Sequence, residues 1–130
     1  MQLSSNTCSL GSSMAECSME TVFSHLVAAR EEQTALFDSI EVEEDFRRSF
    51  VVLWDNFLAD FLCFRTWLFQ RQEDAVTDAW RAVVESSGVL RDKVVSTSSG
   101  EFCQYLTAIL DFAIDQLEYE QYQVFAYGQS

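Results

Sequence analysis

Apolar residues recur along most of the chain at the three- and four-residue spacing of one helical face, and this pattern predicts an all-α protein. The first helix is predicted over residues 19–37, after Ser18, whose hydroxyl can cap its first turn. Residues 1–17 are rich in serine and lack this periodicity, which predicts a mobile leader in front of a helical domain over residues 18–127. The apolar face of the first helix comprises Met19, Val22, Phe23, Leu26 and Val27.

The second predicted helix, at about residues 40–70, is the most hydrophobic part of the chain. Fifteen of the twenty residues in 50–69 are apolar, in a span about as long as a membrane helix needs. Asp55, Asp60 and Arg65 interrupt this run, and each charge at a bilayer centre costs roughly 2.5 to 3.5 kcal/mol on insertion scales. We therefore expect a very hydrophobic central helix surrounded by other helices or by a partner chain. The two aspartates should face water or meet a basic side chain, because an unpaired buried charge is costly.

Capping and turn residues mark the boundaries of the other helices. Asp38 and Glu41 have the spacing of a capping box, which predicts that the second helix begins there. Gly88 is placed to end a short third helix, because glycine readily adopts the left-handed conformation that follows a helix. The chain should therefore form a single-domain bundle of four to five helices around the second one. A break is expected at residues 71–74, and further helices at about 76–84, 89–95 and 99–125.

Composition agrees with long helices and narrows the function classes. Proline is absent and only four glycines occur in 130 residues, which disfavours an all-β fold with its tight turns. The formal net charge of −13 disfavours direct nucleic-acid binding, because clustered Lys and Arg residues are needed to neutralise phosphates. Residues 1–15 lack the basic and apolar segments of a secretory signal, so we expect a cytoplasmic protein, with a nuclear location also open.

Groups that carry catalytic or cofactor chemistry are sparse. His25 is the only histidine, which leaves a histidine-based zinc site or a di-iron motif without ligands. Glycine-rich phosphate loops and the G-x-S-x-G elbow are absent. The four cysteines lack a C-x-x-C spacing, and we expect reduced thiols, with Cys63 and Cys103 as buried packing residues that could also meet in the core. We therefore expect no catalytic residue, no metal and no cofactor, and hence a protein that is not an enzyme.

The surplus of apolar surface predicts a protein–protein interaction module. The second and last helices are apolar on more of their circumference than one neighbour covers. We expect a groove that binds the amphipathic helix of a partner, or a face that joins two copies as a homodimer. Such a protein would act as an adaptor, inhibitor or regulator. The candidate partner-binding residues are Trp54, Phe57, Phe61, Phe64, Trp67, Tyr105, Phe112 and Tyr119.

The acidic charge supports an alternative function. Carboxylates in residues 41–45 and 111–120 can imitate an array of phosphates and occupy the basic site of a nucleic-acid-binding protein. The helix dipole already explains acids in a first turn, which favours the interaction module. Salt distinguishes the two hypotheses, since exposed charges are screened over roughly 8 Å at physiological ionic strength.

Overall fold

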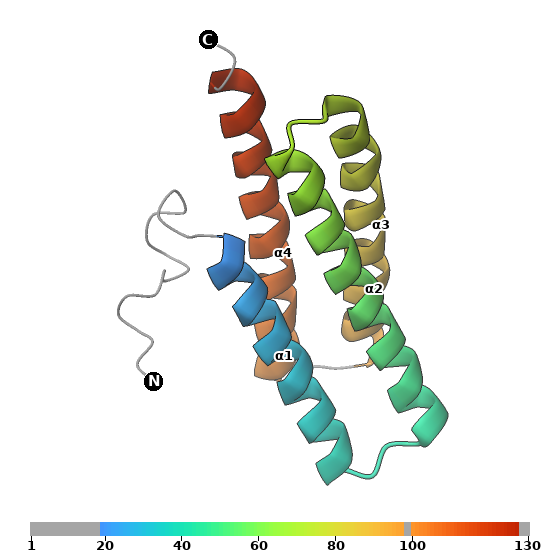
Figure 1. Ribbon diagram of the computed structural model, residues 1–130. Coiled ribbons are helices and arrows are strands. Elements are labelled where there is room, and N and C mark those ends of the chain that lie inside the picture. The colour runs from blue at the N-terminus through green and yellow to red at the C-terminus, as the bar shows by residue number, and fades with distance from the viewer. Residues whose placement is uncertain (1–18, 98–99, 128–130) are drawn as a thin grey trace.

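Four long α-helices and a short π-helical segment make up the described part of the chain, residues 19–97 and 100–127, in the computed structural model (Figure 1). Successive helices run in opposite directions, so the chain forms an up-and-down four-helix bundle. The prediction of a single all-helical domain is confirmed, whereas the predicted leader, 1–17, lies outside the described residues. The elements are α1 (Met19–Ser39), α2 (Glu44–Phe69), α3 (Glu73–Thr97), α4 (Gly100–Tyr122) and η2 (Gln123–Tyr127).

Each helix contributes one apolar stripe to a core shared by all four. The largest share comes from aromatic residues of α2, and the ring centroids of Phe37 in α1 and Phe50 in α2 lie 5.1 Å apart in an edge-to-face arrangement. Burying a large apolar side chain stabilises a fold by roughly 1.5 to 3 kcal/mol, so this stripe is the main source of stability. The largest fully buried apolar side chains are those of Trp54, Phe50, Phe57, Phe61, Phe64, Leu26, Leu90, Leu106, Leu110 and Leu117.

The structure does not support the prediction that α2 is a central helix surrounded on all sides. α2 is one of four helices in a ring and packs mainly against α3, with a smaller contact with α1. A helix in such a ring faces the core on one side only. Apolar residues beyond that side, Val52, Leu62 and Phe69, are therefore exposed. The number of apolar residues in a run does not reveal on which face of the helix each one lies.

The capping box predicted at Asp38 and Glu41 is wrong, because α1 continues to Ser39 and α2 begins only at Glu44. The carboxylate of Asp38 forms an ion pair with Arg47 of α2 at 2.6 Å instead of capping a helix. Glu41 has a φ of 57°, so the chain reverses direction at this residue. An ion pair with the next helix therefore replaces the local hydrogen bonds that the spacing predicts.

α3 runs through Gly88 without interruption, so the two short helices predicted around this glycine are one helix. Glycine inside a helix costs about 1 kcal/mol relative to alanine. The buried side chains of Val83 and Leu90, which lie before and after Gly88 on α3, hold the helix together through their packing in the core. Packing therefore overrides the local preference of the glycine.

The other two connections lie close to their predicted positions. The break predicted at residues 71–74 is confirmed, since α2 ends at Phe69 and α3 begins at Glu73. No proline or glycine forms this turn; Arg71 adopts a φ of 57° there. α4 begins at Gly100, whose φ of 76° lies in the region that glycine adopts without strain.

Candidate functional site

Four of the predicted partner-binding residues lie inside the chain's own core. Trp54, Phe57, Phe61 and Phe64 are each at most 1% exposed. A side chain without exposed surface cannot contact a partner while the bundle stays folded, so we exclude these four from the candidate surface. Helical spacing predicts which side chains share a face, but it does not tell whether that face meets the same chain or another one.

The other four predicted residues keep some exposed surface but do not form one site. Trp67 belongs to α2, whereas Tyr105, Phe112 and Tyr119 belong to α4, and α2 and α4 are not neighbours in the ring. Tyr105 donates a hydrogen bond to the Glu32 carboxylate of α1, and burial together with this carboxylate raises the pKa of the tyrosine to about 12. The stripe on α4 is therefore engaged at least in part with α1.

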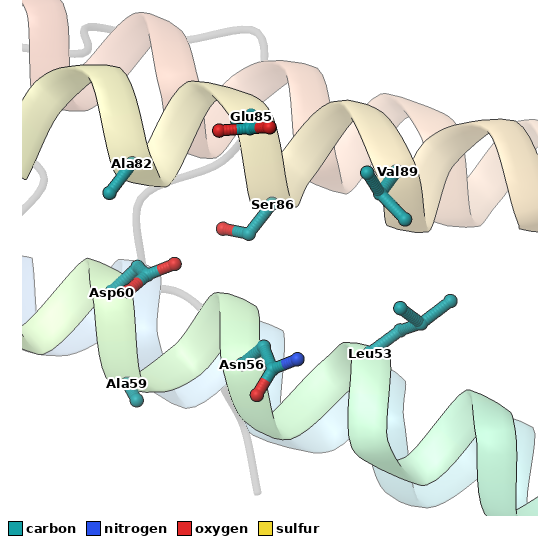
Figure 2. A pocket seen from close by; sticks show the side chains of 8 residues that line it. All are labelled: Leu53, Asn56, Ala59, Asp60, Ala82, Glu85, Ser86 and Val89. Carbon is teal, nitrogen blue, oxygen red and sulfur yellow. The ribbon is translucent and has the colours of Figure 1, made fainter.

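A groove with a volume of about 360 Å³ lies between α2 and α3 on the outer side of the bundle (Figure 2). Its residues recur at helical spacing on each helix, so they form the facing edges of the two helices. Small side chains at Ala59, Ala82 and Ser86 leave the space open between them. We call this site the α2–α3 groove; it is lined by Leu53, Asn56, Ala59, Asp60, Ala82, Glu85, Ser86 and Val89.

The groove has an apolar end and an acidic end. Leu53 and Val89 lie opposite each other at one end, and the carboxylate of Asp60 points toward α3 near the other end (Figure 2). Glu85 projects from α3 near the middle. Within the described residues, neither Asp60 nor Glu85 forms an ion pair or a side-chain hydrogen bond. Both carboxylates are therefore available to a bound molecule.

Basic residues elsewhere in the bundle are almost all engaged. Lys93 places its Nζ 5.4 Å from the ring centroid of Phe46, and Arg71 is the one arginine whose side chain forms no ion pair within the described residues. The protein thus has few free cations to balance its exposed carboxylates. The arginines in ion pairs are Arg30, Arg47, Arg48, Arg65, Arg81 and Arg91.

The polar residues that interrupt the hydrophobic run of α2 lie where the sequence indicates. Asp55 is exposed and its carboxylate lies 3.0 Å from the guanidinium of Arg30, which confirms that it meets a cation. Asn56 and Cys63 are exposed and Asp60 is half-buried, so this strip faces the solvent side of the groove. The expectation that Cys63 is a buried packing residue is therefore wrong, and Cys63 does not meet the half-buried Cys103 in the core.

The sequence predicts a strip on α2 that faces water, through Asn56, Asp60 and Cys63, but it predicts neither a groove beside this strip nor the α3 side of that groove. The water-facing strip on α2 is visible in the sequence as polar residues inside an apolar run. The α3 residues Glu85, Ser86 and Val89 fall where Gly88 predicted a helix end, so they were not placed on one helical face. The available signal was the spacing of three and four residues from Ala82 to Val89, which continues across the glycine.

Other chemistry has little support among the residues that the structure describes. No group of three or more His, Cys, Asp and Glu side chains is arranged to hold a metal ion within residues 19–97 and 100–127. No helix in the same ranges is both long and apolar enough to cross a membrane. His25 is half-buried on α1, and its pairing with a catalytic partner finds no support in the described residues.

Apolar side chains are also exposed at the end of the bundle where α2 joins α3. Phe69 is 87% exposed, and a second hollow of about 450 Å³ lies beside Trp80, Tyr122 and Phe125. These residues add to the apolar surface of the protein. One carboxylate, Glu118, also lines the second hollow and forms no ion pair within the described residues.

Comparison with known proteins does not assign the chain to a family. No protein-family model matches the sequence, and neither the curated proteins nor the solved structures give a significant match. Function must therefore be inferred from the geometry of the bundle itself.

Proposed function

We propose that this protein is a non-enzymatic interaction module, an adaptor, inhibitor or regulator, that binds another protein in the α2–α3 groove. The supporting observation is that one groove combines aliphatic side chains, Leu53 and Val89, with carboxylates, Asp60 and Glu85, that have no partner within the described chain. Apolar contacts supply affinity in such grooves, and paired charges supply specificity.

Charge favours a separate partner over the predicted homodimer. Each copy has a formal charge of −13. Two copies joined through this groove would bring the Asp60 and Glu85 carboxylates of both together, and like charges placed against each other cost several kcal/mol. A partner with basic residues would instead compensate these carboxylates.

The nucleic-acid mimic is the second candidate function. The shortage of free cations supports it, because most exposed carboxylates remain uncompensated. The proposed acidic arrays are, however, partly occupied: Glu44 and Asp45 both bind Arg48, and Asp111 binds Arg91. Fewer carboxylates than the sequence suggests are free to imitate phosphates, which is why we favour the groove.

A site-specific photo-crosslink tests the proposed function. A photoreactive amino acid replaces Val89 in the groove of the full chain or, as a matched control, Val95, which is on the same helix outside the groove and is similarly exposed, at 51% against 48%. In cells that express the protein, a discrete adduct is expected from position 89 and not from position 95.

Four other outcomes contradict the proposal. No adduct at position 89, or equal adducts from both positions, would remove the groove as the binding site. An adduct that contains two copies of this chain would identify the homodimer. Association that disappears at modest salt and on substituting Glu41 and Glu43 by glutamine would instead favour the phosphate mimic, because those two acids lie outside the groove.

A further inference from the structure

We infer that the occupant of the α2–α3 groove is an amphipathic helix that presents an aliphatic side chain to Leu53 and Val89 and a basic side chain to Asp60. This inference rests on the proposed function and adds the chemistry of the partner. It follows from the length of the groove, its floor and its charge.

The length of the groove matches two turns of a helix. Leu53 and Asp60 are seven residues apart on α2, and Ala82 and Val89 are seven residues apart on α3. Seven residues correspond to a rise of about 10 Å. A partner helix lying along the groove therefore reaches both ends with side chains seven positions apart, which share one face of that helix.

The floor of the groove admits another helix at close range. Ala59 and Ala82 have short side chains, and the hydroxyl of Ser86 is turned back to donate a hydrogen bond to the Val83 carbonyl at 3.3 Å. A side chain of the partner can therefore lie between α2 and α3, in the way that the ridge of one helix fits the groove of another. The aliphatic side chains of Leu53 and Val89 would cover the apolar part of the partner's side chain.

Charge decides between a basic helix and a purely apolar one. Asp60 is half-buried and its carboxylate points toward α3, while the exposed Glu85 lies farther along the groove, above Ser86 on α3 (Figure 2). An apolar helix would cover both carboxylates and remove their water without replacing it, which is costly. An arginine at this position would donate charge-assisted hydrogen bonds to Asp60 and leave Glu85 to a second basic residue at the rim.

A pair of synthetic helical peptides tests this inference on the full-length protein. The first peptide carries leucine and, seven positions later on the same face, arginine. The second has the same composition, but its arginine is moved to the opposite face. Because the two peptides have the same composition, general attraction to an acidic protein is equal for both. Affinities are measured by isothermal titration at near-physiological salt, which weakens this general attraction. The first peptide is expected to bind about tenfold more tightly, as one charge-assisted hydrogen bond implies.

Two matched substitutions locate the effect. Asp60→Asn should abolish the difference between the peptides, whereas Asp92→Asn, an exposed acid on α3 outside the groove, should leave it unchanged. Glu85→Gln, at an exposed position, gives an independent measurement if Asp60→Asn disturbs folding, which circular dichroism would reveal. Equal binding of both peptides, or equal effects of the Asp60 and Asp92 substitutions, would overturn the inference and show only general charge attraction.

The outcome is separable from that of the proposed function. A groove-specific photo-adduct at Val89 without any preference between the peptides would keep the interaction module and reject the basic helix as its partner. Absence of the adduct would reject the groove itself as the binding site.

Discussion

Replacing Trp54 by phenylalanine breaks a hydrogen bond in the centre of the bundle. The indole Nε1–H of Trp54 donates to Oε1 of Gln33 at 2.5 Å, and both side chains are 1% exposed. Nε2 of Gln33 already has no hydrogen-bond partner within the described residues. The substitution would therefore leave the whole amide of Gln33 buried and unsatisfied between α1 and α2.

The expected loss of stability has two parts. Leaving a buried polar group unsatisfied costs roughly 1 to 3 kcal/mol. The smaller phenyl ring also leaves a cavity, which adds about 1 to 2 kcal/mol for the lost atoms and their contacts. We expect Trp54→Phe to lower the free energy of unfolding by about 2 to 5 kcal/mol, a large share of the roughly 5 to 15 kcal/mol typical of a domain.

A second substitution isolates the hydrogen bond from the cavity. Gln33→Leu in the Trp54→Phe background removes the unsatisfied amide at similar volume, so it should recover about 1 to 3 kcal/mol. The assay is urea unfolding followed by far-ultraviolet circular dichroism for the wild type, both single variants and the double variant. A coupling energy below about 0.5 kcal/mol would refute the reasoning, because independent sites give additive effects within that range.

Three further outcomes follow from the fold. Burial and Glu32 raise the pKa of Tyr105 from 10.0 to about 12, so between these pH values the folded chain keeps a proton that the unfolded chain loses. The free energy of unfolding should therefore fall as the pH rises from 10 to 12. In urea unfolding, Tyr105→Phe should lack the share of this decrease that Tyr105 causes. Gly88→Ala should raise the thermal midpoint and stabilise the protein by about 0.5 to 1 kcal/mol, since no atom lies within 4 Å of the added methyl group. A destabilised variant would indicate that the helix breaks at Gly88. In chemical unfolding, Phe61→Ala should lower the free energy of unfolding by about 3 to 5 kcal/mol, whereas Phe69→Ala should change it by less than about 0.5 kcal/mol. Similar losses at both positions would contradict the one-sided burial of α2.

Helical periodicity was sufficient to predict the all-helical class and most of the chain's helical segments. α1 extends only two residues beyond its predicted end at residue 37, and the turn between α2 and α3 lies at the predicted break. Such features depend on the side chains of a single helix, which the sequence shows directly. The predictions that were wrong depend on contacts between helices.

Gly88 and Asp38 illustrate this limit. A glycine ends a helix when local preference decides, but the buried residues on both sides of Gly88 tie α3 to the core and keep it continuous. An aspartate caps a helix when nothing competes, but Arg47 of α2 binds the carboxylate of Asp38. In both cases the deciding contact joins two helices, and the pattern within one helix does not show such a contact.

Contacts between helices also explain why the candidate site differs from the one predicted. Aromatic residues of α2 were predicted to bind a partner because their face is apolar, and the structure places Phe57 and Phe61 in the chain's own core instead. Asn56 and Asp60, the polar residues inside the apolar run, were better indicators of the groove. Burying a polar residue is costly, so such residues lie where they contact water or a charged partner.

Chemical-shift mapping of the isotope-labelled full chain with the leucine–arginine helical peptide tests the central claim most directly. Binding in the groove predicts shifts at residues 53–60 of α2 and 82–89 of α3, with α1 and α4 little affected. Shifts spread over acidic residues of all four helices, or confined to the exposed end near Phe69, would contradict a partner-binding groove between α2 and α3.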